Sequence, residues 1–164
     1  MTTPPHGTHR ILVEALGDSD ALGALGVGEW LSFARWAEAV ERVRLREFAG
    51  LPEPEGARQV GRRIGERFIQ SSIGQLVGTT LEVLTVDRAF GLLVPTLGAR
   101  MRAPFQVDWQ ASPEGGVLSI VGPIVTHPQV TLGFFEIFVD RLSGHPKVTL
   151  RRADEGRLEL AITR

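Results

Sequence analysis

Residues 56–102 read GARQVGRRIGERFIQSSIGQLVGTTLEVLTVDRAFGLLVPTLGARMR and decide the expected fold. The stretch begins with apolar residues every four positions, at Val60, Ile64 and Phe68, and charged residues lie between them. This spacing places the apolar side chains on one face of a helix. The stretch therefore predicts long helices, and it separates a helix-rich first half of the chain from a strand-rich second half.

A second apolar stripe follows in the same stretch, and Ser71 predicts a break between the two helices. The second stripe consists of Ile73, Leu76, Val77, Leu81 and Leu84. A shorter helix is expected over residues 88–94. Pro95 is expected to end it, because proline lacks the backbone N–H that continues a helix.

Two Gly-x-x-x-Gly pairs, Gly61 with Gly65 and Gly74 with Gly78, predict close approaches to another backbone. A glycine inside a helix costs about 0.5–1 kcal/mol relative to alanine. At about 100° per residue the second pair lies roughly 220° around an unbroken helix from the first. The pairs therefore face different neighbours, or the helix bends near Ser71. Packing within the chain is favoured, and a homodimer interface formed by the four glycines is the alternative.

The chain before this stretch predicts a tail and one further helix. Residues 1–10 are polar and are expected to form a flexible tail. The apolar run 11–16 is too short to distinguish a strand from a helical turn. A helix is expected over residues 29–48, and Pro52 and Pro54 end it.

The second half changes to a two-residue period and predicts strands around one helix. Strands are expected at 105–110 and 117–121, and a second hairpin at 148–150 and 158–162. Between the hairpins, residues 129–143 are apolar around much of a helical circumference, with Pro at the start and Gly after the end. The order in this half is therefore β-β-α-β-β.

These elements predict an α+β fold with about four N-terminal helices, followed by a half that contains a four-stranded antiparallel sheet. A chain of 164 residues suits a single domain spanning residues 1–164. The helical half covers residues 29–98, and the sheet half covers 104–164.

Composition excludes several classes of function. The chain has no Cys, so disulfides, thiolate nucleophiles and cysteine-ligated metal centres are excluded. A formal net charge of -1 indicates no general attraction to nucleic acid. No apolar run approaches the ~20 residues of a membrane span. A cytoplasmic protein without a membrane span is expected.

No catalytic constellation or metal site is evident, and neither a catalytic residue nor a cofactor is predicted. The four His residues have no zinc-type spacing, and no Gly-x-Ser-x-Gly elbow occurs. Asp18 and Asp20 are interpreted as a helix cap or an Asx turn. The interpretation leans against an enzyme.

Glu136 is the one carboxylate with a conceivable catalytic role. Burial would raise its pKa and suit it to general acid–base chemistry. A position on the solvent edge of its helix is favoured instead. An enzyme that combines Glu136 with Arg100 or Arg102 in one cleft is kept as a third hypothesis.

Phe134, Phe135 and Phe138 form the most distinctive apolar cluster in the sequence. The favoured interpretation is core packing of the 129–143 helix against the sheet. Two alternatives remain open. In the first, the three rings and Trp109 line a pocket between this helix and the sheet that binds a hydrophobic small molecule or lipid. In the second, the rings form a homodimer face.

Several short motifs resemble the paralogous family of unknown function that is expanded in myxobacteria, from about Trp30 to the C-terminus. They are Ala57-Arg-Gln-Val-Gly-Arg, Ser72-Ile-Gly-Gln, Thr85-Val-Asp-Arg-Ala, Leu93-Val-Pro, and the Gly133-containing helix followed by Gly144 and a terminal hairpin. These motifs are mostly structural, so the resemblance implies a fold and is nearly silent on chemistry.

More distantly, helices followed by such a sheet resemble the superfamily of haem-nitric-oxide-binding domains, four-vinyl-reductase domains and vesicle-tethering subunits. The resemblance implies dimerisation and, in some members, a hydrophobic ligand. The chain has no Tyr, so the Tyr-x-Ser-x-Arg propionate clamp of the haem members is absent. It also has no Cys to carry an acyl chain, and neither haem nor covalent lipid is expected.

The leading hypothesis is a non-enzymatic regulatory, sensory or scaffolding module. It would act through protein–protein interaction with an unknown protein partner, as a homodimer whose helical half supplies the interface. The alternative hypothesis is the hydrophobic-ligand binder described above.

Overall fold

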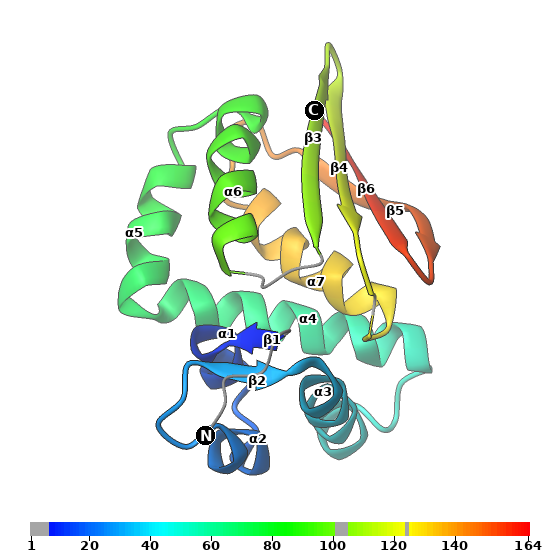
Figure 1. Ribbon diagram of the computed structural model, residues 1–164. Coiled ribbons are helices and arrows are strands. Elements are labelled where there is room, and N and C mark those ends of the chain that lie inside the picture. The colour runs from blue at the N-terminus through cyan, green and yellow to red at the C-terminus, as the bar shows by residue number, and fades with distance from the viewer. Residues whose placement is uncertain (1–6, 101–104, 124) are drawn as a thin grey trace.

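The computed structural model describes residues 7–100, 105–123 and 125–164, except for the side chains of 97–100. Within these residues the chain forms seven helices, a two-stranded sheet and a four-stranded antiparallel sheet (Figure 1). The predicted α+β class and the four-stranded antiparallel sheet are confirmed. Figure 1 shows α4 crossing the molecule, with the N-terminal elements on one side and α7 with the large sheet on the other.

The N-terminal elements form a small layer of strands and helices. They are β1 (Gly7–His9), α1 (Arg10–Leu16), α2 (Ser19–Leu25), β2 (Trp30–Ser32) and α3 (Phe33–Glu47). Strands β1 and β2 pair antiparallel, so part of the segment expected as a tail is ordered. The apolar run 11–16, left open between strand and helix, is helical. The helix expected from residue 29 begins at Phe33, because Ser32 caps it by accepting a hydrogen bond from the Arg35 N–H at 3.4 Å.

Helices α4 (Glu53–Gln70) and α5 (Ser72–Leu81) meet at the predicted break. The Ser71 hydroxyl donates to the Phe68 carbonyl at 2.5 Å and accepts from the Gly74 N–H at 3.1 Å. One side chain thus ends the first helix and caps the next. The break at Ser71 is confirmed.

The apolar stripe expected on α5 is buried only in part: Leu81 is buried with α6, α7 and the large sheet, and Val77 and Leu84 pack against the same core. Leu76 is 74% exposed and Ile73 is 48% exposed, whereas Gly74 and Gly78 are buried. A side chain at Gly74 would collide with the Phe68 carbonyl oxygen. The glycine face of α5 therefore packs against the end of α4, and Leu76 is the most exposed residue of the expected stripe.

Helix α6 (Val86–Arg100) is longer than the helix expected over 88–94, and Pro95 lies inside it. The prediction that Pro95 ends the helix is wrong. Proline has a φ angle that is compatible with a helix. It destabilises the helix because one backbone hydrogen bond is lost and its ring clashes with the carbonyl one turn earlier. Thr96, the next residue, donates its hydroxyl to the Leu92 carbonyl at 3.0 Å and remains in the helix.

The large sheet has the strand order β3-β4-β6-β5. Its strands are β3 (Gln106–Ser112), β4 (Gly115–Val121), β5 (Lys147–Asp154) and β6 (Arg157–Thr163). Helix α7 (Pro128–Val139) lies between the two hairpins in sequence and ends four residues before the expected boundary at 143. Buried residues of β4 and β6, Leu118 and Leu160, are paired in register beneath it.

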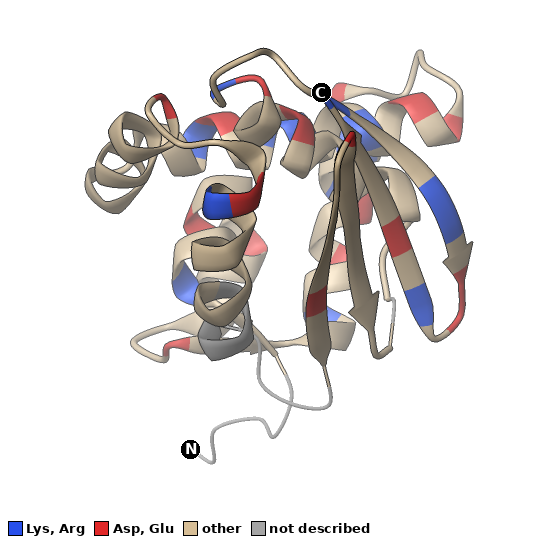
Figure 2. Cartoon of the chain, turned by 90° about the horizontal axis from the view of Figure 1, so that it is seen from above, with Lys and Arg blue, Asp and Glu red and all other residues tan. Residues whose placement is uncertain are grey.

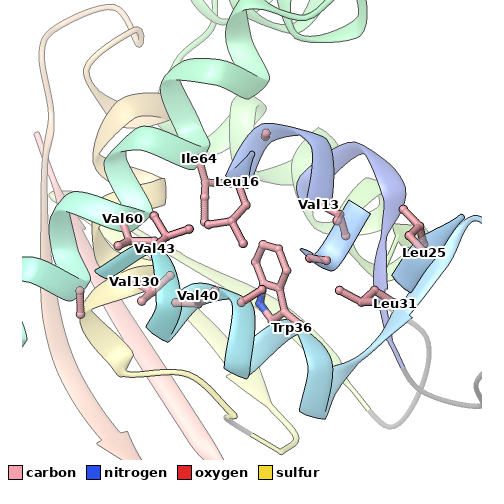
Figure 3. Packing of buried hydrophobic residues seen from close by; sticks show 14 residues of the cluster. Val13, Leu16, Leu25, Leu31, Trp36, Val40, Val43, Val60, Ile64 and Val130 are labelled. Carbon is pink, nitrogen blue, oxygen red and sulfur yellow. The ribbon is translucent and has the colours of Figure 1, made fainter. Parts of the chain in front are cut away.

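Two apolar cores lie on either side of the α4–α7 pair. The first joins α1, α2, α3, α4 and Val130 of α7, and Figure 3 shows Trp36 at its centre. The second joins α6, α7 and the large sheet. Phe68 of α4 and Phe134 of α7 pack against both cores. These two rings mark the junction where the candidate site lies.

Within the part of the chain that the structure describes, no helix is both long and apolar enough to cross a membrane.

Candidate functional site

An apolar cavity of about 220 Å³ lies at the junction of the two cores. Its wall is contributed by β1, α1, α3, α4, α5, α6, α7, β4, β6 and the segments before β3 and after β4. The buried part of the lining, called the floor here, includes the side chains of Thr8, Trp36, Ile64, Ile120, Val130, Phe135, Phe138 and Leu158. The rim contains the exposed residues Ile73, Thr96, Pro123 and Val125. The cavity therefore runs from a closed apolar interior to the surface.

Three of the four residues expected to bind a ligand line this cavity. Phe134, Phe135 and Phe138 point into it from α7, and the ring centroids of Phe134 and Phe138 are 4.7 Å apart. Phe68 of α4 adds a fourth ring, 5.7 Å from that of Phe138. Trp109 is not among the described lining residues, and it stacks on Phe90 with centroids 4.6 Å apart.

The lining provides very few polar atoms. No described lining residue is charged, and none is His, Cys, Met or Tyr. The side-chain hydrogen-bonding groups are the indole of Trp36 and the hydroxyls of Thr8, Thr96, Thr126 and Thr131. A cavity of this composition suits binding through apolar contact, because no side chain of its described lining titrates.

Sequence reasoning missed the N-terminal part of the lining. Thr8, Ile11, Leu12, Phe33 and Trp36 all contribute to the wall. The sequence predicts a tail and an undecided element for the first two segments, so it gives no sign that they line a cavity. The apolar run 11–16 was the available signal, since a run of this kind beside a polar tail needs a partner to cover it.

Glu136, expected on the solvent edge of its helix, is buried and paired. Its residue exposure is 7%, and its carboxylate accepts from Arg58 Nε at 3.1 Å and from Arg62 at 3.0 Å. The Arg58 terminal nitrogen also donates to the same carboxylate. These hydrogen bonds outweigh burial and raise the pKa of Arg58. Arg102 and the side chain of Arg100 lie outside the described residues.

Glycines bring the backbones of α4 and α7 together beside this ion pair. A side chain at Gly61 would collide with the Val130 carbonyl oxygen, and one at Gly133 with the Arg58 carbonyl oxygen. A Cβ at Gly65 would lie 2.9 Å from the Cβ of Ile137. Gly61 and Gly65 therefore pack against α7 of the same chain, which is the interpretation favoured from the sequence. A role for Gly61, Gly65, Gly74 and Gly78 in a dimer interface stays a prediction.

Asp18 acts as the expected helix cap and also forms a buried ion pair. Its carboxylate accepts from the Ala21 N–H at 3.0 Å and from Arg42 at 2.6 Å, and Arg46 lies 3.5 Å away. Burial raises the pKa of Asp18, but the hydrogen bonds from Arg42 and Ala21 outweigh it and lower the pKa below its ordinary value. This cluster therefore fixes α2 against α3.

No group of three or more His, Cys, Asp or Glu suited to a metal ion occurs among the described residues. His127 instead caps α7, where its Nδ1 accepts from the Gln129 N–H at 3.1 Å.

Comparison with known proteins gives a family and a fold. A family model described as a protein of unknown function (DUF2378) matches residues 27–163. No protein of curated function matches the sequence.

Solved structures of H-NOX domains share the fold. One, from work on the molecular mechanism of H-NOX activation, has a TM-score of 0.61 at 12% identity and covers 95% of each chain. A crystal structure of an oxygen-binding H-NOX domain related to soluble guanylate cyclases has a TM-score of 0.61 at 13% identity, over 93% of this chain and 90% of that chain. A further solved structure, from work on modulating haem redox potential through protein-induced porphyrin distortion, has a TM-score of 0.55 at 15% identity, over 94% of this chain and 96% of that chain. At these identities the likeness establishes the fold.

Proposed function

We propose that this chain, which belongs to the DUF2378 family of proteins of unknown function, is a sensory module whose central cavity binds an apolar small molecule. The apolar cavity at the junction of the two cores is the observation that carries the proposal. The H-NOX fold supports it, because the matching structures include an oxygen-binding domain. The absence of charged groups from the described lining favours recognition of a ligand over its chemical conversion.

Haem does not fit the lining. Haem iron is held in proteins by His, Cys, Met or Tyr side chains. The described lining contains none of these, and it has no Arg or Lys to pair with the propionates. The proposed ligand is therefore not haem.

Native mass spectrometry of the purified chain tests this proposal. We expect a fraction of the protein to carry a non-covalent adduct that disappears when the same sample is denatured. Delipidated protein should then regain a ligand from an extract of the producing cells. A single unliganded mass before and after that incubation would contradict the proposal.

Self-association is a second candidate function, and the outer face of α5 favours it. Leu76 is 74% exposed on α5, Val83 just after α5 is 79% exposed, and Leu92 of α6 is 61% exposed. No charged residue lies on α5, which appears as an uncharged helix at the left of Figure 2. An uncharged helix with exposed apolar side chains is typical of an interaction surface.

Sedimentation velocity at tens of micromolar tests the homodimer. Leu76→Glu should shift a dimer to monomer, whereas Leu45→Glu, on the 54% exposed Leu45 of α3, should not. A wild-type monomer would refute this candidate and leave the cavity proposal untouched. A protein partner, a cytoplasmic location and membership of the paralogous group expanded in myxobacteria are part of the same proposal, and they rest on composition and resemblance.

A further inference from the structure

We infer that the cavity selects a small, uncharged, compact molecule and excludes haem and long-chain lipids, an inference that rests on the proposed function. The ligand class follows from three properties of the cavity: its volume, the charge of its lining and its closed floor. Each property excludes a different group of ligands.

The volume sets the size of the ligand. Pockets for drug-sized ligands typically measure roughly 300–1,000 Å³, and this cavity measures about 220 Å³. An apolar cavity of roughly 150 Å³ is large enough to bind benzene or xenon. The cavity therefore suits a molecule of one substituted ring or a short branched hydrocarbon, and a tetrapyrrole is too large for it.

The lining sets the charge of the ligand. A charged group transferred into an apolar site without a partner costs several kcal/mol or more. The described lining provides no charged side chain, and the Thr96 hydroxyl already donates to the Leu92 carbonyl. A carboxylate or ammonium inside the cavity would lack an oppositely charged partner in the described lining, so the ligand is neutral.

The floor limits the length of the ligand. Ile64, Phe138 and Leu158 are at most 3% exposed, and Leu158 is fully buried. A long acyl chain that enters past the half-exposed Ile73 at the rim meets this closed floor within the cavity. Compact ligands fill the space without leaving an apolar tail in water.

Calorimetry with four probes tests the inference on the full chain. Toluene is the small neutral probe, benzoate carries the same ring with a charge, palmitate is the long-chain probe, and hemin is the macrocycle. We expect toluene to bind and to raise the melting temperature. Benzoate, palmitate and hemin should bind at least about tenfold more weakly or not at all.

Matched tryptophan variants locate the binding site. Leu93 lines the cavity from α6, and its neighbour Leu92 is 61% exposed and is not among the described lining residues. Leu93→Trp should weaken toluene binding by about tenfold or more, and Leu92→Trp should leave it unchanged. Ile73→Trp at the rim, with Leu76→Trp as its control on the same helix, gives a second test that avoids the core.

The outcomes separate this inference from the proposed function. Binding of palmitate, hemin or benzoate that Leu93→Trp or Ile73→Trp abolishes would overturn the inference and leave the cavity as a ligand site. Toluene binding that all four variants retain would place the ligand elsewhere and overturn both. Failure of every probe to bind would also overturn both.

Discussion

Gly61 is a position where a single added methyl group should lower stability. Its backbone touches the Val130 carbonyl, so Gly61→Ala forces α4 and α7 apart. Overpacking of this kind costs about 1–3 kcal/mol. Gly91→Ala on α6 is the matched control, because nothing lies within 4 Å of its Cβ position. The control should gain about 0.5–1 kcal/mol from helix propensity. Chemical denaturation measures the free energy of unfolding of Gly61→Ala and Gly91→Ala. Equal stability of the two variants would contradict close packing at Gly61.

Asp18 should contribute a pH-dependent part of the stability. Its pKa is lowered in the folded state, so this contribution is fully present above the ordinary Asp pKa of about 3.9 and is lost as pH falls through the folded pKa. Asp18→Asn keeps a capping side chain but removes the charge. We expect it to lower the free energy of unfolding by about 1–2 kcal/mol at pH 7.

The difference between wild type and Asp18→Asn should shrink when denaturation is repeated below about pH 4. Asp20→Asn is the control, since the Asp20 side chain is 78% exposed. If the difference in the free energy of unfolding between wild type and Asp18→Asn stays constant down to pH 2, the charge of Asp18 does not contribute to stability.

Residue roles were predictable where the cause is local. The capping role of Asp18 and the break at Ser71 follow from hydrogen bonds made within three residues. The burial of Glu136 was not predictable, because its partners Arg58 and Arg62 lie more than 70 positions away in sequence. No periodicity in α7 distinguishes a paired buried carboxylate from a solvated one.

The α4–α7 pair is held by charge as well as by glycine contacts. Glu136→Gln keeps the shape of the side chain but removes the charge that faces Arg58 and Arg62. We expect a loss of about 1–3 kcal/mol in the free energy of unfolding. Asp140→Asn, at an exposed residue that ends the same helix, should change stability by less than about 0.5 kcal/mol. Equal effects of the two substitutions would show that the ion pair contributes nothing to the contact.

Elements with a clear period were predicted better than elements next to glycine or proline. The Val60, Ile64 and Phe68 repeat located α4, and the two-residue alternation located the hairpins. Helix α5 was predicted and its stripe is buried at Leu81, but Leu76 of the same stripe is exposed, because the Gly74 face is the one that packs closely against α4. Pro95 was treated as a terminator, although α6 tolerates it at the cost of a hydrogen bond.

The cavity belongs to the whole molecule, which is why the sequence indicated only part of it. The α7 rings were identified as candidates from composition alone. The opposite wall comes from β1, α1 and α3, which lie far earlier in the chain. Pairing of β1 with β2 brings that wall into place, and nothing in a three-residue strand predicts such a partner.

A crystal structure of the full chain grown with toluene would show whether the cavity holds the ligand. We expect electron density for one ring inside the cavity, in contact with Phe134 and Phe138 of α7 and with Phe68 of α4. Density for toluene only at the outer face of α5, or a cavity filled by repacked side chains, would contradict this expectation.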